Sequence, residues 1–273
     1  MKVWLNGAMV DRDAARVSVF DHGFTVGDGV FETTKVVDGR PFALTRHLDR
    51  LQVSAVKMGL PGPDEAVVRD AVEQVVAQLG QDLGRVRITY TAGEAPLGSG
   101  RGDAEPTLVV AASTMTPWPA TEAVAVVPWV RNERSAVAGV KTTAYAENVV
   151  ALAHAKAQGA GEALFANTAG ELCEGTGTNV FVVHDGIART PPLDAGCLAG
   201  VTRALVLAWC PQIREENLTL YDLASADEVF LTSSTRDVQG VHAVDGRVLG
   251  KGPVTASIAN AFVKHARLDP DPI

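Results

Sequence analysis

The sequence lacks the features that mark membrane, secreted and nucleic-acid-binding proteins. No apolar run approaches the roughly 20 residues that span a bilayer, and residues 1–7 lack the charged start and apolar middle of a signal peptide. Lys and Arg number 24 against 32 Asp and Glu, which gives a formal net charge of −8. Because no basic excess is present to hold phosphates, we expect neither a nucleic acid nor a membrane as partner.

Cysteine is scarce, and the motifs that bind metals or activate a serine are absent. The three cysteines, Cys173, Cys197 and Cys210, form no CxxC pair, as is typical of reduced thiols in an intracellular protein. HExxH, GxSxG and P-loop motifs do not occur, and no His/Cys cluster has metal-ligand spacing. The sequence therefore predicts a cytoplasmic protein without a metal site.

Apolar material is plentiful, with 47% hydrophobic residues in a chain of 273, which excludes disorder as the dominant state. At about 150 residues per domain this length fits one large or two modest domains. Pro117 and Pro119 interrupt the pattern of secondary structure and suit a linker. We predict an α+β protein with an N-terminal α/β domain over 1–113, a linker over 114–120 and a C-terminal domain over 121–273.

Residue periodicity predicts the main elements of both domains. Residues 29–37 alternate in polarity and end at the hairpin dipeptide Asp38-Gly39. Helical spacing of apolar residues predicts helices over 47–58 and 64–80. Further strands are expected at 2–5, 17–20, 85–91, 107–113, 123–130, 163–166, 179–183, 187–190 and 228–232, and further helices from about 145, 202 and 253.

Two residues stand where covalent or acid–base chemistry is expected. Lys141 follows an apolar strand, precedes an amphipathic helix and has no neighbouring carboxylate, which suits an amine of lowered pKa that acts as a nucleophile. Glu174 lies in a glycine-rich turn before a strand, where a carboxylate can pair with a cationic ring nitrogen. Taken alone, an ordinary exposed lysine at a helix start and a polar turn residue fit the two positions as well.

Two further segments have the composition of phosphate sites. Residues 200–203 open a helix, and Ser233-Ser234 follows a strand, so backbone N–H groups and hydroxyls gather at both. Either could be a plain helix N-cap. Arg50 lies on a predicted helix whose other face is apolar. Its guanidinium could bind a phosphate with two hydrogen bonds, or it could be a solvated surface charge. Together an amine, a carboxylate, a phosphate cup and an arginine are what pyridoxal phosphate needs.

The order of these parts resembles the class IV (fold type IV) pyridoxal-phosphate enzymes over nearly the whole chain. That family holds branched-chain aminotransferases, D-amino acid aminotransferases, amine transaminases and 4-amino-4-deoxychorismate lyases. The resemblance implies two domains with the active site between them, pyridoxal 5'-phosphate as cofactor and a homodimer. It rests on residues 6–7, 21–23, 27–32, 47–51, 162–164, 174–181, 190–192, 200–203, 227–233 and 252–255.

The same resemblance implies roles for individual residues. Lys141 would form a Schiff base with the cofactor aldehyde and move a proton between substrate and cofactor, and Glu174 would keep the ring nitrogen protonated. Tyr145 would contact the phenolic oxygen of the cofactor, although a core aromatic on the helix fits equally. The cofactor phosphate would be bound by Arg50, Val201, Thr202, Ser233 and Ser234.

The substrate is less clearly marked, because the sequence departs from each subfamily. Residues 31–35 read Phe-Glu-Thr-Thr-Lys where branched-chain enzymes usually have Phe-Glu-Gly-Ile-Arg. Residues 91–93 lack the Arg-x-His carboxylate trap of D-amino acid aminotransferases, and Ala144 stands where the lyases often have asparagine. The candidate substrate-binding residues are Phe31, Lys35 and Arg101, with Arg131 and Arg134 as further cations.

We therefore predict an aminotransferase that moves an amino group between a small amino acid or amine and a keto acid. The alternative on the same scaffold is a 4-amino-4-deoxychorismate lyase, which forms 4-aminobenzoate and pyruvate. A pyridoxal-binding protein without activity is disfavoured, because Lys141 and Glu174 are both present.

Overall fold

The computed structural model describes residues 1–250 and 252–273, and their contacts divide the chain into two compact units. Unit 1 holds Met1–Pro117, Val140–Tyr145 and Pro270–Ile273, and unit 2 holds Trp118–Gly139 and Ala146–Asp269. Each unit combines helices with one sheet, so the predicted α+β class is confirmed. No helix in the described part of the chain is long and apolar enough to cross a membrane.

Unit 1 is built on a six-stranded antiparallel sheet with the order β2-β1-β6-β5-β3-β4. Its central strands β3 and β5 pair over their whole length, from Gly29 opposite Thr91 to Val36 opposite Gly84. The strands are β1 (Lys2–Leu5), β2 (Ala8–Asp11), β3 (Gly29–Val37), β4 (Arg40–Pro41), β5 (Gly84–Thr91) and β6 (Thr107–Thr114).

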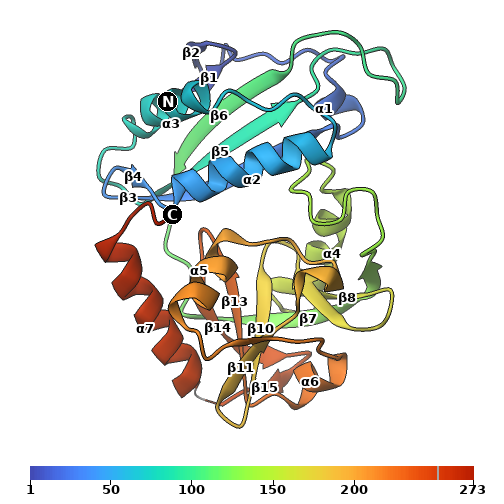
Figure 1. Ribbon diagram of the computed structural model, residues 1–273, viewed down its shortest axis with the longest axis vertical. Helices are drawn as coiled ribbons and strands as arrows, with labels where there is room; N and C mark the ends of the chain where they lie inside the picture. Colours follow the sequence, from blue (N-terminus) through green and yellow to red (C-terminus); the bar gives the residue numbers. More distant parts are fainter. Residues whose placement is uncertain (251) are drawn as a thin grey trace. The chain divides into compact units, whose positions relative to one another are not determined.

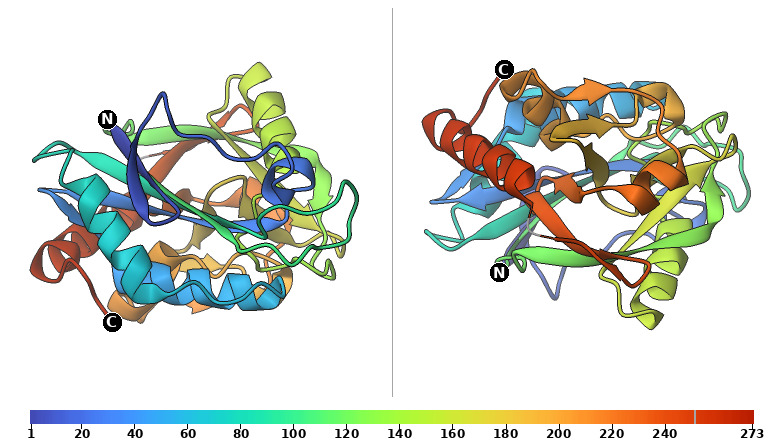
Figure 2. Two further views of the ribbon diagram at one scale, coloured as in Figure 1. Left: turned by 90° about the horizontal axis from the view of Figure 1, so that it is seen from above. Right: turned by 90° about the horizontal axis from the view of Figure 1, so that it is seen from below.

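Two long helices, α2 (Leu44–Lys57) and α3 (Glu65–Val76), lie on one face of this sheet (Figures 1 and 2). Asp64 starts α3, because its carboxylate accepts hydrogen bonds from the backbone N–H groups of Ala66 and Val67. Apolar side chains spaced three and four apart on both helices pack on the buried residues of β3, β5 and β6. A single turn, α1 (His22–Thr25), precedes β3 and begins at Asp21.

Unit 2 contains a nine-stranded sheet of mixed direction with the order β12-β11-β10-β13-β14-β7-β8-β9, and β15 pairs with β14. The strands are β7 (Thr121–Arg131), β8 (Glu162–Asn167), β9 (Leu172–Gly175), β10 (Asn179–His184), β11 (Ile187–Thr190), β12 (Arg214–Glu215), β13 (Glu228–Ser233), β14 (Asp237–Val244) and β15 (Arg247–Val248).

The helices of unit 2 cover its sheet from both sides. α4 (Ala146–Ala157) packs on β7 and β8, and the short α6 (Leu220–Ser225) closes the core on the other side. α5 (Val201–Trp209) and α7 (Pro253–Leu268) contact each other and β13 (Figure 1). They lie on the sheet face that carries the stacked rings of Phe181 and Phe230. A 3-10 turn, η1 (Leu193–Ala195), leads toward α5.

The strand expected at 17–20 is wrong. Residues 17–20 form a loop and a turn in which the Ser18 hydroxyl accepts from Phe20 N and the Ser18 carbonyl accepts from Asp21 N. The Val17 and Val19 side chains are exposed, so the alternation reflects a surface segment rather than a half-buried strand. Sequence periodicity also missed β2, β9 and β14, and it placed the remaining long strands within a few residues of their observed bounds.

Lys141 belongs to unit 1, although we expected it in the C-terminal domain. The backbone N–H of Phe31 donates to the Lys141 carbonyl over 2.9 Å, and Thr143 N–H donates to Gly29 over 2.8 Å. Residues 141–143 thus pair with the start of β3, and backbone pairing rather than chain order decides where Lys141 lies.

Candidate functional site

Lys141, Phe31 and Tyr145 meet at the start of β3 in unit 1. The Lys141 Nζ lies 4.5 Å from the centroid of the Phe31 ring, and the Tyr145 ring meets the same ring edge-on at 5.2 Å. The Lys141 backbone N–H lies 3.4 Å from the Ser54 hydroxyl of α2. Three of the residues singled out in the sequence are therefore brought together around one aromatic ring.

Sequence reasoning missed a fourth member of this group, Arg87 of β5. Its guanidinium carbon lies 3.8 Å from the Phe31 ring centroid, so the ring contacts two cationic side chains. Partial burial lowers the pKa of Arg87, and the neighbouring Tyr145 hydroxyl acts in the opposite direction. The available signal was strand pairing, because Arg87 faces Thr33, two residues from Phe31 on the same side of β3.

Arg50 lies beside a fully buried carboxylate. Its Nε and Nη2 atoms donate to both oxygens of Glu32, over 2.7 and 2.8 Å. His47, one turn earlier on α2, contacts Glu32 Oε2 through Nδ1 at 2.7 Å. Glu32 and His47 are essentially inaccessible to solvent, and 12% of the Arg50 side chain is exposed. A helix and a strand thus hold one guanidinium in a single orientation.

The protonation states in this cluster follow from its geometry. Burial raises the pKa of Glu32, but the charges and hydrogen bonds of Arg50 and His47 more than offset it and leave that pKa well below its usual value. Burial lowers the pKa of His47, and Arg50 and Lys141 add to this against the opposing effect of Glu32. His47 is therefore neutral at pH 7 and donates from Nδ1 to the ionised Glu32.

Arg101, the cation proposed for the substrate carboxylate, has a structural role instead. Its Nε and Nη2 atoms donate to both oxygens of Asp28 over 2.7 and 2.6 Å, and the guanidinium also donates to the carbonyls of Met58 and Gly59. These contacts attach the long loop over residues 92–106 to the end of α2. The hydrogen bond from Arg101 lowers the pKa of Asp28 despite its partial burial.

The remaining candidate cations contact other side chains. Lys35 lies four residues along β3 from Phe31, about 13 Å at the usual rise of a strand, with its Nζ 5.7 Å from the Phe42 ring. The Arg134 side chain is 89% exposed and lies 3.8 Å from Glu133. Arg131 in unit 2 forms ion pairs with Glu147 and with Glu174. The expectation that Arg131 binds a substrate carboxylate is therefore replaced by a role beside Glu174.

Glu174 lies on β9 in unit 2, held from two sides. Its Oε2 accepts from the backbone N–H of Leu198 over 2.8 Å, and its Oε1 lies 3.2 Å from Arg131 Nε. Burial raises the pKa of the Cys173 and Cys197 thiols, and the charge of Glu174 raises both further. All three cysteines are free, as the sequence indicated, and the structure shows that they are also buried.

The predicted phosphate-binding segments also lie in unit 2. α5 begins at Gly200, which has no side chain to cap it, so the N–H groups of Val201 and Thr202 have no partner within the helix. Ser233 ends β13, and its hydroxyl accepts from Arg236 N across the turn that contains Ser234. Thr232, only 1% exposed, has a buried hydroxyl without a hydrogen-bond partner in the described structure.

These residues fit pyridoxal phosphate. An uncapped helix start and hydroxyls, one of them orphaned, suit a phosphate dianion. A carboxylate oriented by Leu198 suits a protonated ring nitrogen, and the Lys141 amine suits an aldehyde. The described residues contain no group of His, Cys, Asp and Glu that could hold a metal ion.

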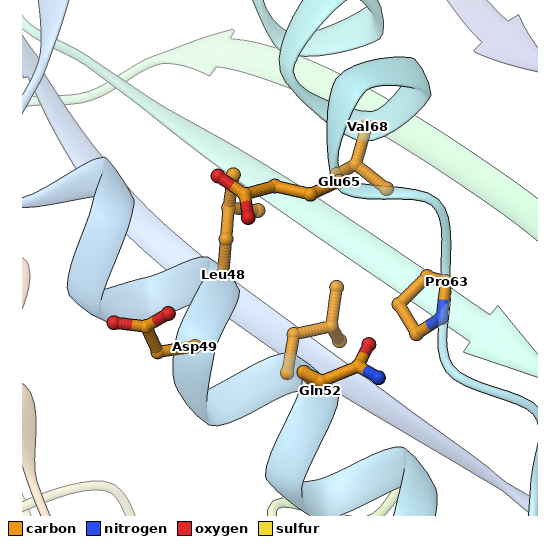
Figure 3. Close-up of a pocket in the computed structure, with 7 residues that line it drawn as sticks. Leu48, Asp49, Gln52, Pro63, Glu65 and Val68 are labelled. Atoms are coloured by element: carbon orange, nitrogen blue, oxygen red, sulfur yellow. The ribbon is translucent and has the colours of Figure 1, made fainter.

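A separate pocket lies between α2 and α3 (Figure 3). Leu48, Leu51 and Val68 supply apolar surface, and Asp49 of α2 and Glu65 of α3 contribute carboxylates to its lining. None of the predicted site residues lines it. The pocket has neither a nucleophile nor a cation, so it offers no chemistry for a phosphate or an amino acid.

Comparisons with known proteins show the family of this chain. Residues 29–244 match the family model described as amino-transferase class IV. A Methanocaldococcus jannaschii protein provisionally named a branched-chain-amino-acid aminotransferase is 35% identical, covering 96% of this chain and 95% of that protein. D-alanine aminotransferase from Listeria monocytogenes is 30% identical, covering 97% and 96%.

Solved structures give the same result. The branched-chain aminotransferase of Thermoproteus uzoniensis, crystallised with norvaline, has a TM-score of 0.90 at 30% identity over 97% of this chain and 94% of that one. A Legionella pneumophila protein provisionally named a 4-amino-4-deoxychorismate lyase has a TM-score of 0.87 at 25% identity, covering 93% and 97%. The chain therefore belongs to the class IV aminotransferases, a family of pyridoxal-phosphate enzymes.

Proposed function

We propose that this enzyme transfers the amino group of a small amino acid to a keto acid. One observation carries the proposal: the Phe31 ring contacts both the Lys141 amine, at 4.5 Å, and the Arg87 guanidinium, at 3.8 Å. The amino group and the carboxylate of an amino acid are attached to the same carbon, so the reacting lysine and the cation that binds the carboxylate must lie close together. The branched-chain and D-alanine aminotransferases among the relatives support the same substrate class.

The residues of unit 1 perform the proton chemistry. Pyridoxal phosphate supplies an aldehyde and a ring that takes up electrons from the substrate α-carbon. Lys141 would hold that aldehyde through its Nζ and would move a proton to and from the substrate α-carbon. Phe31 lies beside the lysine amine and Tyr145 packs edge-on against Phe31, so the two rings restrict the space open to the Lys141 side chain.

The other residues bind and orient the cofactor. Glu174 would accept a hydrogen bond from the protonated ring nitrogen, while Leu198 N–H and Arg131 orient its carboxylate. The backbone N–H groups of Val201 and Thr202 bind the phosphate. The hydroxyls of Ser233 and Ser234 would add donors to the same anion, and Arg50 stays a predicted phosphate-binding residue.

Arg87 takes the role that the sequence analysis gave to Arg101. It is a planar donor that can bind a carboxylate with two hydrogen bonds, and it lies on the same ring as Lys141. Arg101 already donates to Asp28 and two carbonyls. Arg87 therefore selects substrates with an α-carboxylate over simple amines.

The experiment compares Arg87→Gln with the wild type on D- and L-amino acids and on 1-phenylethylamine, which has no carboxylate. We expect kcat/KM for amino acids to fall by about a hundredfold or more and that for the amine to change little. Arg85→Gln, two residues earlier on β5 and exposed, is the matched control. An equal loss on both substrate types would contradict the role of Arg87.

The same preparation decides between transfer and lyase chemistry. Incubation with 4-amino-4-deoxychorismate and no keto acid is expected to give no 4-aminobenzoate. The specific reason to run it is the fold shared with the Legionella protein. Formation of 4-aminobenzoate together with no keto-acid-dependent turnover would replace the aminotransferase by the lyase.

The homodimer and the cytoplasmic location stay predictions. Exposed apolar side chains support the dimer, because soluble monomers rarely expose large apolar surfaces to solvent. They come from residues 17–26 and the 92–106 loop of unit 1: Val17, Val19, Phe20, Phe24, Val26 and Leu97. Sedimentation equilibrium is expected to give twice the mass of the chain, and a monomer at assay concentration would exclude it.

A further inference from the structure

In unit 2, both backbone polar groups of Leu198 form hydrogen bonds with side chains. Glu174 Oε2 accepts from Leu198 N–H over 2.8 Å, and Asn179 Nδ2 donates to the Leu198 carbonyl over 2.9 Å. Both side chains come from one short segment, since Glu174 is on β9 and Asn179 begins β10. Leu198 lies two residues before Gly200, the N-cap of α5.

Gly200 shows how closely Asn179 approaches the start of α5. A Cβ atom at Gly200 would lie 2.0 Å from the Asn179 Oδ1 and 3.1 Å from its Cγ. The φ of Gly200 is −66°, which any residue can adopt. Glycine is therefore required here by the contact with Asn179 and not by the backbone conformation.

Asn179 is itself fixed in place. It is 5% exposed and is paired with Thr232 across β10 and β13. The two residues share the sheet face on which α5 packs, together with Phe181 and Phe230. The orphaned Thr232 hydroxyl and Ser233 thus lie on the same pair of strands as Asn179, and Ser234 follows in the next turn.

We propose that Asn179 is a positioning residue that sets the start of α5, and with it the phosphate-binding N–H groups of Val201 and Thr202. It acts through the Leu198 carbonyl and does not touch the cofactor. Glu174 also accepts a hydrogen bond from Leu198. The segment 174–179 therefore positions both the Glu174 carboxylate, proposed for the ring nitrogen, and the N–H groups of α5, proposed for the phosphate. This inference rests on the proposed cofactor roles of Glu174, Val201 and Thr202.

The test compares two ligands that differ only in the phosphate. Pyridoxal phosphate and pyridoxal carry the same aldehyde for Lys141, so the ratio of their dissociation constants reports on the phosphate site alone. The full chain, stripped of cofactor, is titrated with each ligand and followed by absorbance. For Asn179→Ala we expect affinity for pyridoxal phosphate to fall about tenfold, with less than about a twofold change for pyridoxal.

A second variant disturbs the same contact from the other side. Gly200→Ala retains Asn179 in the sequence but adds a Cβ that clashes with its amide, and we expect the same selective loss. It keeps the proposal testable if Asn179→Ala does not fold. The matched control is Asn167→Ala, which removes a buried amide that donates to Glu171 and to the Ala195 carbonyl. The control is expected to lower the melting temperature without changing the ratio of the two affinities.

The outcomes separate this inference from the proposed function. Equal losses for both ligands in Asn179→Ala, or an unchanged ratio in Gly200→Ala, would show a merely structural role and overturn the inference. A wild type that binds both ligands equally would instead overturn the phosphate role of α5, and this inference with it.

Discussion

The substitution Glu32→Gln tests the buried charges of unit 1. It keeps the shape of the side chain but removes the negative charge that both Arg50 and His47 contact. Glu32 is fully buried, and only 12% of the Arg50 side chain reaches solvent. The variant therefore leaves a guanidinium in the protein interior without its counter-charge.

The expected magnitude follows from that burial. Breaking a buried ion pair by removing one partner lowers the free energy of unfolding by about 3–5 kcal/mol, because the remaining charge stays desolvated. Replacing both partners with apolar residues of similar size has a much smaller effect. Glu32→Met with Arg50→Met is therefore expected to be more stable than Glu32→Gln, although it removes the arginine that we propose as a phosphate ligand.

Urea unfolding followed by circular dichroism measures these differences. The control is Glu65→Gln, which removes an exposed ion pair with Arg69 on α3 and is expected to change stability by less than about 1 kcal/mol. Two results would contradict a buried ion pair of this strength. One is a free energy of unfolding for Glu32→Gln equal to that of the control. The other is a double methionine variant whose free energy of unfolding does not exceed that of Glu32→Gln.

The pH dependence gives a second check on Glu32. Its pKa in the folded state is far below the 4.5 of the unfolded chain, so its ionisation stabilises the fold at every pH above 4.5. That contribution is lost as the pH falls from 4.5 toward the folded-state pKa. The stability gap between wild type and Glu32→Gln is therefore expected to narrow below pH 4.5, and a gap that stays constant would contradict the ionised state.

Three further variants test other parts of the structure. Lys141→Ala is expected to abolish turnover and the near-visible absorbance that appears on adding pyridoxal phosphate, and retention of either would exclude Lys141 as the reacting amine. Glu174→Gln should still bind the cofactor but lose most of the rate, and full activity would exclude the ring-nitrogen role. Arg101→Ala is expected to free the 92–106 loop from Asp28, so that limited proteolysis cuts within it, and unchanged resistance would show that other contacts hold the loop.

Elements that depend on local pattern could be predicted from the sequence. Buried and exposed residues alternate over most of β5 because one face of the sheet packs under α2 and α3, and α3 is marked by its cap at Asp64. The prediction of a strand over 17–20 was wrong, because alternation alone does not reveal whether a segment pairs with a neighbouring strand. β14 was missed because Gly240 and several polar residues interrupt its apolar pattern.

The partners of charged side chains could not be predicted, because they come from distant segments. Arg101 meets Asp28 across 73 residues, and Arg131 meets Glu174 only when β7 and β9 flank β8. Arg87 stood in an ordinary strand pattern, and its contact with Phe31 depends on the pairing of β5 with β3. The resemblance in motifs identified Lys141 and Glu174 but gave no information on these contacts.

The beginning of α2 is completed by residues from the far end of the chain. Its N-cap, Ala43, has no side chain that can accept a hydrogen bond, and Asp271 instead accepts from the backbone N–H and the hydroxyl of Thr45 over 2.8 and 2.7 Å. These contacts join residues 226 apart, so closing them is slow and entropically unfavourable. Any folding intermediate that forms before residues 270–273 dock has a frayed first turn just ahead of His47 and Arg50. We therefore expect the first turn of α2 to become ordered late in folding. We also expect that removing residues 270–273 would destabilise the Glu32, His47 and Arg50 cluster, although none of these three residues is removed.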